Sequence, residues 1–278
     1  TYLVKNAHKI RGILITHGHE DHIGAVPFLL QQINVPIYGT RLSLGIIEGK
    51  LDENPPPFDP ELYTVEAGDV INLGVFKAEF IHVNHSIADA CAIALKTPVG
   101  TVFHTGDFKL DVSPIDGKMM DLTRIGEIGK AGVELLLCES TNAERAGFTA
   151  SERTVGYSLE RIFAQYEDRR LIITTFSSNV HRVQQIINTS HRHGRKVAIL
   201  GRSMINVIGA AAELGYTIKL IGHAEVDAEG KLLAMVSPRM VPLSNPMSTI
   251  DGVFNGILVG ANMVGDVMFY GPGAGKLP

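Results

Sequence analysis

The sequence is poor in cysteine and has no long apolar run. Its two cysteines, Cys91 and Cys138, lie far apart in strand-like segments, so neither a disulfide framework nor a cysteine-rich zinc site is expected. A reducing, cytoplasmic setting is expected instead. No apolar stretch is long enough to cross a membrane and no basic-then-apolar leader opens the chain, so insertion and export are not indicated. The first residue is Thr1 rather than Met, which leaves open that the chain is a fragment.

Internal repeats and low-complexity tracts are also lacking. The 278 residues, 45% of them hydrophobic, suffice for one large domain or two ordinary ones. A formal charge of −4 argues against general coating of nucleic acid, yet seven of the 25 basic residues lie between Arg169 and Arg202, where no Asp or Glu occurs. This basic window predicts a local polyanion-binding face. A solvated basic helix surface is the alternative, and charge alone does not decide between them.

Hydrophobic patterning predicts a strand-rich α/β first half. A buried strand over residues 10–16 precedes a His-rich loop, and a helix with an apolar face follows over residues 23–32. Further strands are expected at 35–38, 62–65, 70–83, 91–96, 100–104 and 133–139, the last of them buried.

The pattern of predicted secondary structure changes twice in the second half. Helices at 152–166, 179–193 and 204–214 alternate with strands at 171–176 and 196–200, a pattern that predicts βα units on a parallel sheet. From residue 217 onward, long strands at 231–241, 253–259 and 267–270 follow without a convincing helix.

The loop after the first strand has the composition of a metal site. His17, His19 and His22 supply imidazoles that suit zinc, and Asp21 supplies a carboxylate for a second ion. Gly18 is expected to let the backbone turn tightly between two of the ligands. A chance polar loop is the alternative, but three histidines and an aspartate within six residues are improbable.

A two-metal site needs further ligands from distant loops. His85 and Asp107 each follow a predicted strand, and we expect both to join the site. Two ions roughly 3.5 to 4 Å apart would clamp a phosphate during in-line attack by water. His82 and His104 are expected to be supporting or core histidines rather than ligands.

The segment from Ile15 to Gly24 resembles the signature of the metallo-β-lactamase superfamily, and its surroundings resemble bacterial ribonuclease J from Thr1 to about Tyr216. The motifs that carry this resemblance begin at Pro36, His85, Lys96, His104, Ser140, Ser151, Thr175 and Gly201. Members of that family are metal-dependent ribonucleases in which a βα insert, the β-CASP subdomain, closes over the hydrolase site.

The resemblance implies residue roles. His17, His19 and His85 would hold one zinc ion, Asp21 and His22 the other, and Asp107 would bridge them, with Mn²⁺ or Mg²⁺ as alternative ions. Asp21 would also accept a proton during catalysis. RNA is the implied partner, and no membrane partner is expected. Whether the chain forms a homo-oligomer is left undecided. The implied RNA-facing residues are Ser178, Asn179, His181, Arg182, Arg202 and Ser203.

The chain departs from that family at both ends. The family's opening strands, its phosphate-binding loop after the insert and the last ligand of the second metal have no counterpart. Residues from about 213 onward instead resemble the catalytic domain of homoserine dehydrogenase, in segments 217–222, 236–242, 255–259 and 268–278. The glycines near Lys276 fit neither a phosphate loop nor a dinucleotide fingerprint, so a nicotinamide cofactor is not expected.

These observations predict an α/β chain of three parts. An incomplete metallo-β-lactamase αββα sandwich (1–140) precedes a β-CASP-like βα segment (141–216) and a homoserine dehydrogenase-like strand segment (217–278). The expected function is zinc-dependent RNA phosphodiester hydrolysis, impaired by truncation and fusion. A non-catalytic RNA-binding remnant and a dehydrogenase fragment are the alternatives. Thioesterases and lactonases of the same superfamily are disfavoured by the basic insert.

Overall fold

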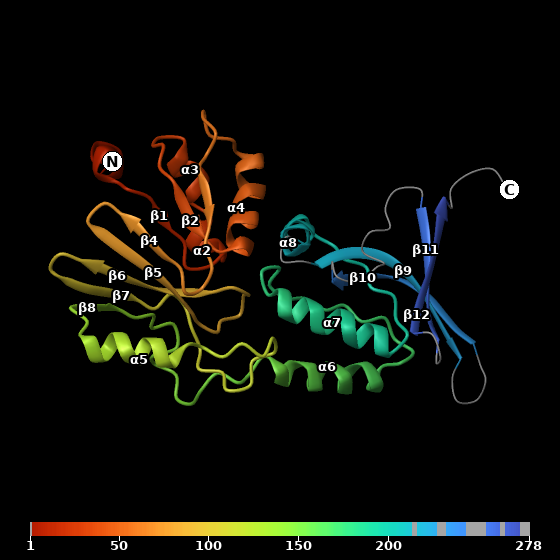
Figure 1. Cartoon of the computed structure of the whole chain (residues 1–278). Helices are drawn as coiled ribbons and strands as arrows, with labels where there is room; N and C mark the ends of the chain where they lie inside the picture. The colour runs from red at the N-terminus through yellow and green to blue at the C-terminus, as the bar shows by residue number, and fades with distance from the viewer. Residues whose placement is uncertain (1, 213–215, 227–231, 243–253, 262–264, 273–278) are drawn as a thin grey trace.

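The computed structural model describes residues 2–212, 216–226, 232–242, 254–261 and 265–272 (Figure 1). Two sheets lie between helices in the first half, three helices follow, and two separate hairpins end the described chain. No helix in the described ranges is long and apolar enough to span a membrane.

The first half is an αββα sandwich. One sheet is parallel, in the order β1 (Ile13–Leu14), β2 (Ile37–Gly39) and β3 (Leu62–Thr64). The second sheet follows chain order and is antiparallel except for its last pair, with β4 (Val70–Leu73), β5 (Phe76–His82), β6 (Cys91–Thr97), β7 (Gly100–His104) and β8 (Leu135–Leu137). The helices are α1 (Tyr2–Lys5), η1 (Ala7–Lys9), α2 (Glu20–Ile23), α3 (Val26–Leu30), α4 (Arg41–Glu53) and α5 (Leu122–Ala131).

Apolar side chains on both faces of the second sheet build the core. On β5, Phe80 packs with Cys91 on the face toward the first sheet, whereas its neighbour Ile81 packs with Ala92 and Ile128 on the other face. Successive side chains of a strand point to opposite faces, so a strand covered on both sides is apolar throughout. Because the second sheet is packed on both faces, the ends of its strands, from which the polar loops leave, are held in place.

The described residues of the second half contain three helices, α6 (Arg153–Gln165), α7 (Val180–Arg192) and α8 (Arg202–Ala212), as the sequence predicted. The strands predicted at 171–176 and 196–200 are wrong, since neither segment joins a ladder with any described residue. Ile172 and Leu200 are 87% and 86% exposed. An apolar run becomes a strand only where a neighbour takes its backbone hydrogen bonds. Between residues 141 and 212 the regular structure is therefore helical.

Several other expectations need correction. The strand predicted at 133–139 shortens to β8, whose leucines are 44–58% exposed rather than buried because β8 lies at the edge of the sheet. The strand predicted at 70–83 is divided by a turn at Gly74, which has a φ of 69°. Helices α4 and α5 were not predicted. The long strands of the tail are confirmed as two antiparallel hairpins, β9 (Tyr216–Val226) with β10 (Leu232–Pro242) and β11 (Phe254–Ala261) with β12 (Gly265–Pro272).

Candidate functional site

The His-rich loop begins where β1 ends, and its backbone enters α2 at Glu20. Two neighbours fix its start. The Thr16 carbonyl accepts a hydrogen bond from the Cys91 backbone at 2.9 Å, and the Thr16 hydroxyl lies 3.1 Å from Nδ1 of His17. Nδ1 of His17 is thereby engaged, and Nε2 is left to face the other polar loops.

Ligand-type atoms from three loops gather in two groups. The first joins His17, His19, His85 and Asp107, and the second joins Asp21, His22 and Asp107. Within each group the donor atoms all lie within 4.8 Å of one another. The structure thus brings together all six residues that the sequence singled out as metal ligands.

Asp107 is the residue that the two groups share. Its Oδ2 lies 3.9 Å from Nε2 of His17, 3.8 Å from Nε2 of His85 and 3.4 Å from Nε2 of His22. In the first group Nδ1 of His19 is 3.0 Å from Nε2 of His85. A carboxylate in this position can accept one ion on each side.

The electrostatics of the first group favour a cation. Burial, reinforced by the neighbouring histidines, lowers the pKa of His17 to about 2, and burial also lowers the pKa of His85 to about 4. Both rings are therefore neutral at physiological pH, the form that binds metal. The Nε2 atom of His17 is buried without a hydrogen-bond partner. An unsatisfied buried nitrogen aimed at a carboxylate and two imidazoles fits a zinc-type ion.

Two glycines permit the close approach of these loops. Gly106 has a φ of 58°, and a Cβ there would lie 2.8 Å from the Cys91 carbonyl oxygen. Gly18 was expected to permit a tight turn between two ligands, but the structure shows a different need for glycine at this position. A Cβ at Gly18 would lie 3.2 Å from Cα of Ser43 on α4, so glycine lets the loop pack against that helix.

The remaining histidines of this region lie outside both groups. His104 accepts a hydrogen bond at Nδ1 from the Gly106 backbone at 3.0 Å, and Nε2 of His82 lies 3.3 Å from the Lys118 carbonyl. Neither joins a metal group among the described residues. The position of His104 lets it support the turn before Asp107.

The predicted RNA-facing residues gather at the first turns of α7 and α8. The Asn179 side chain accepts the Arg182 backbone N–H as the N-cap of α7, and the Ser177 and Ser203 hydroxyls lie 2.6 Å apart, joining the two helix starts. Sequence reasoning missed Ser177 although it adjoins Ser178 in the same motif. Helix N-termini attract phosphate through free N–H groups and the helix dipole. His181 and His85 line the same small cavity, so the start of α7 lies beside the histidine cluster.

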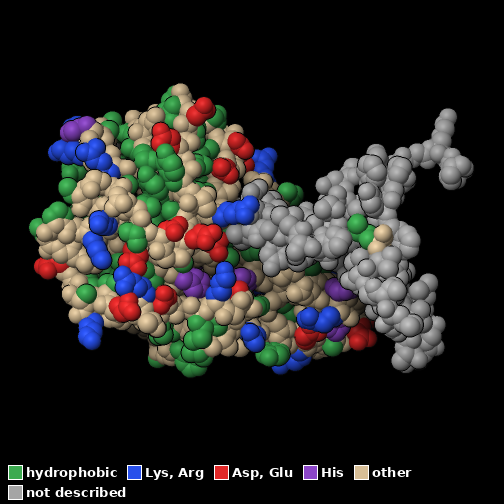
Figure 2. Space-filling model, in the orientation of Figure 1, with side chains coloured by type: hydrophobic (Ala, Val, Ile, Leu, Met, Phe, Trp, Pro, Cys, Tyr) green, Lys and Arg blue, Asp and Glu red, His purple; other side chains and the backbone are tan. Residues whose placement is uncertain are grey.

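Acidic side chains of α6 and its N-terminal turn neutralise part of the basic window. The Arg182 guanidinium donates to both carboxylate oxygens of Glu152, at 2.7 and 2.8 Å, and Arg192 pairs with Glu160. On the face seen in Figure 2, basic and acidic side chains lie interspersed. The count of charged residues from Arg169 to Arg202 leaves out Glu152 and Glu160, because both precede that segment in the chain. Arg170, Lys196 and Arg202 have no ion-pair partner within the described ranges.

The Glu152–Arg182 pair predicts a stability effect. Arg182→Ala would leave the Glu152 carboxylate, 9% exposed, without its counter-ion, so we expect the free energy of unfolding to fall by about 3 kcal/mol. Arg192→Ala, which removes an arginine 57% exposed, is the matched control and should cost less than about 1 kcal/mol. Urea denaturation followed by circular dichroism measures both. Equal small losses would contradict a structural role for Arg182.

Two family models match the chain. Residues 2–119 match the metallo-β-lactamase superfamily, and residues 168–234 match the ribonuclease J β-CASP domain. The chain is 49% identical to ribonuclease J of Synechocystis sp. over 218 residues, which cover 78% of this chain and 34% of the relative. It is 45% identical to ribonuclease J of Thermus thermophilus over 224 residues, covering 77% and 39%. The chain thus spans little more than a third of the length of these relatives.

A solved structure supports the fold. A protein of unknown function from Enterococcus faecalis superposes with a TM-score of 0.54 at 21% identity, covering 73% of this chain and 48% of that one. The β-CASP match runs past Tyr216, where the sequence predicted a change of family, and residues 235–278 lie outside both family matches. The predicted boundary near Tyr216 and the homoserine dehydrogenase-like tail stay predictions.

Proposed function

We propose that this ribonuclease J homologue hydrolyses RNA phosphodiesters with two metal ions bound at the His17–Asp107 cluster. The observation that carries the proposal is the shared carboxylate of Asp107, which lies within 3.9 Å of histidine nitrogens from both donor groups. Zn²⁺ suits the donor set, and Mn²⁺ or Mg²⁺ are the alternatives. When bound, such a pair of ions supplies Lewis acidity and lowers the pKa of water.

The protein's own residues would divide the remaining work. Asp21, whose side chain is 79% exposed and lies 3.6 Å from Nε2 of His22, is placed to accept a proton from water. The N-termini of α7 and α8 would position RNA phosphates through backbone N–H groups and the Ser178 and Ser203 hydroxyls, without reading bases. Because both cysteines are free thiols, we propose a reducing, cytoplasmic setting for this activity.

Single-turnover cleavage of 5′-monophosphorylated RNA tests the proposal. We expect cleavage of the bound strand with added Zn²⁺ or Mn²⁺ and none after chelation, since the histidines and carboxylates alone supply no strong electrophile. Cleavage that persists in chelator would contradict the proposal. The product lengths distinguish exonucleolytic from endonucleolytic action.

RNA affinity should depend on salt. If Arg170, Lys196 and Arg202 each neutralise one phosphate, a plot of log K against log salt should have a slope of about −2, because each contact with a single strand contributes about −0.7. Changing all three to Ser should flatten the slope. The control changes three exposed lysines outside the window, Lys5, Lys9 and Lys77, to Ser. Fluorescence anisotropy at several salt concentrations measures the slope, and an unchanged slope in the first variant would contradict this contact set.

RNA binding without turnover is the second candidate function. The second donor group offers three residues where the first offers four, and one of the three, Asp21, is largely exposed. A weakly held second ion would leave the RNA-positioning helices in place while slowing hydrolysis. Binding with no cleavage at saturating metal would favour this candidate. Binding of a nicotinamide cofactor would instead favour the dehydrogenase-like assignment of the tail.

The unequal donor sets predict unequal metal affinities. We expect two Zn²⁺ ions to bind, the second at least ~10-fold more weakly, because losing even an indirect ligand contact costs that much. Titration with Zn²⁺ against a chromophoric chelator measures both constants. Two equal constants would mean that a further group completes the second donor set.

A further inference from the structure

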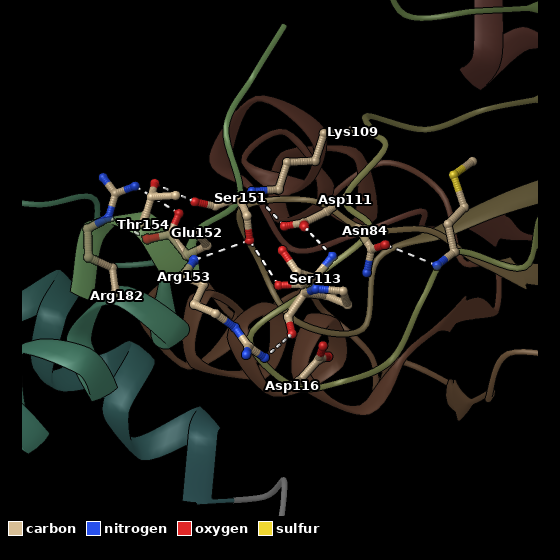
Figure 3. A network of polar contacts seen from close by, with 12 residues as sticks. Asn84, Lys109, Asp111, Ser113, Asp116, Ser151, Glu152, Arg153, Thr154 and Arg182 are labelled. Carbon is tan, nitrogen blue, oxygen red and sulfur yellow. Dashed lines mark hydrogen bonds and ion pairs between the residues drawn. The ribbon is translucent and has the colours of Figure 1, made fainter. Parts of the chain in front are cut away.

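A polar network ties the loop after β7 to the start of α6, and Asp111 lies at its centre (Figure 3). Asp111 follows Asp107 by four residues, and its side chain is 3% exposed. It accepts a hydrogen bond from the Ser113 backbone at 2.9 Å, and Nζ of Lys109 lies 3.6 Å from its Oδ2. A buried carboxylate needs such partners to stay ionised.

Residues at the start of α6 hold the same loop. The Ser151 hydroxyl donates to the Ser113 carbonyl at 2.9 Å, and the Arg153 guanidinium donates to the Pro114 carbonyl at 3.2 Å. Burial alone would raise the pKa of Asp111, but the hydrogen bond from the Ser113 backbone and the nearby Lys109 ammonium help to keep that pKa below its ordinary value. Ser113 is thus held from two sides, by the Asp111 carboxylate at its N–H and by the Ser151 hydroxyl at its carbonyl.

On its other side the loop is fixed to the strand end that carries His85. The Lys109 backbone donates to the Asn84 carbonyl at 2.7 Å. The Asn84 side chain accepts from the Met120 backbone at 3.0 Å and donates to the Lys118 carbonyl at 2.7 Å. Asn84 directly precedes His85, so the loops bearing His85 and Asp107 are held to one another.

The network continues into the helices that bear the RNA-facing residues. Glu152, next to Ser151, accepts both Arg182 hydrogen bonds from α7, and Nε2 of Gln185 donates to the Glu152 carbonyl at 3.1 Å. An unbroken series of polar contacts therefore runs from α7 through α6 to the loop that carries Asp107.

We propose that Asp111 is a positioning residue that fixes Asp107 relative to the insert helices, so that the docking of α6 sets the geometry of the metal cluster. This inference rests on the proposed metal site and adds a residue to it. Partners that orient a metal ligand without touching the metal commonly change its affinity by roughly 10–100-fold when they are replaced. Asp111 lies in the same loop as Asp107, so its replacement would change the position of the ligand that both donor groups share.

Co²⁺ titration of the full chain tests this role through the visible absorption of the bound ion, which reports ligand geometry as well as affinity. Asp111→Asn keeps an acceptor for the Ser113 N–H but removes the charge that faces Lys109, and we expect roughly tenfold weaker binding of the second ion with an altered spectrum. Ser151→Ala removes the hydrogen bond from the start of α6 to the Ser113 carbonyl and should shift affinity and spectrum in the same direction by less. Asp116→Asn is the matched control, since Asp116 is exposed in the same loop and loses the same charge.

The outcomes separate the two proposals. If the unsubstituted chain binds no Co²⁺, the proposed metal site itself fails. If that chain binds two ions and Ser151→Ala leaves both affinity and spectrum unchanged, the proposed link from α6 through this loop to the metal cluster is overturned, whether or not Asp111→Asn folds. An equal shift in Asp116→Asn would also overturn it, because loop charge alone would then account for the effect.

Discussion

Asp107→Ala is expected to reduce single-turnover cleavage of RNA by at least ~100-fold, because displacing a reacting group by about 1 Å already costs that much. The substitution should also weaken the binding of both metal ions. Asp107 is the one residue common to the two donor groups found among the described residues, so its loss removes a ligand from each. Metal content after gel filtration and the cleavage rate at saturating Mn²⁺ measure the two effects.

Glu20→Ala provides the matched control for that result. Glu20 follows His19 as the first residue of α2, its side chain is 75% exposed, and it pairs with Lys50 outside both donor groups. We expect this variant to keep both ions and its cleavage rate. If Asp107→Ala also kept full metal stoichiometry, a bridging role for Asp107 would be ruled out.

The metal-free protein should lose stability in mild acid. The pKa values of His17 and His85 are lowered to about 2 and about 4, whereas an unperturbed histidine has 6.5. Between pH 6.5 and pH 4 the unfolded chain therefore binds protons that the folded chain does not, and the free energy of unfolding falls as the pH falls. At pH 5 the expected loss is about 2 kcal/mol per histidine relative to pH 8.

Urea denaturation in chelator at pH 5 and pH 8 measures this loss. His85→Gln should reduce this loss by about 2 kcal/mol, the contribution of one such histidine. His8→Gln, at an exposed histidine of η1, should leave it unchanged. Equal stability at the two pH values would mean that these rings are protonated in the folded state, which would contradict their burial as neutral ligands.

The sequence predicted that the side chains from His17 to His22 lie close together, because their spacing is local. A strand followed by a short polar loop places those side chains at one sheet edge whatever the remainder of the fold does. His85 and Asp107 were also found because each follows a β-strand of this sandwich. Their approach to within 3.8 Å, in contrast, depends on the Gly106 turn, which sequence spacing does not specify.

The insert was harder to predict for physical reasons. Residues 171–176 have the apolar composition of a strand, but backbone pairing is decided by neighbours that the local sequence does not name. The charge window likewise indicated a basic face, although Glu152 and Glu160 from an earlier segment pair with Arg182 and Arg192. Helix α4 was missed because Gly45 and Gly49 weaken its helical pattern.

Anomalous diffraction at the zinc edge from crystals grown with Zn²⁺ tests the two-metal centre most directly. We predict two peaks roughly 3.5 to 4 Å apart, one among His17, His19 and His85, the other beside Asp21 and His22, with the Asp107 carboxylate between them. A single peak, or two peaks that do not share Asp107, would contradict it.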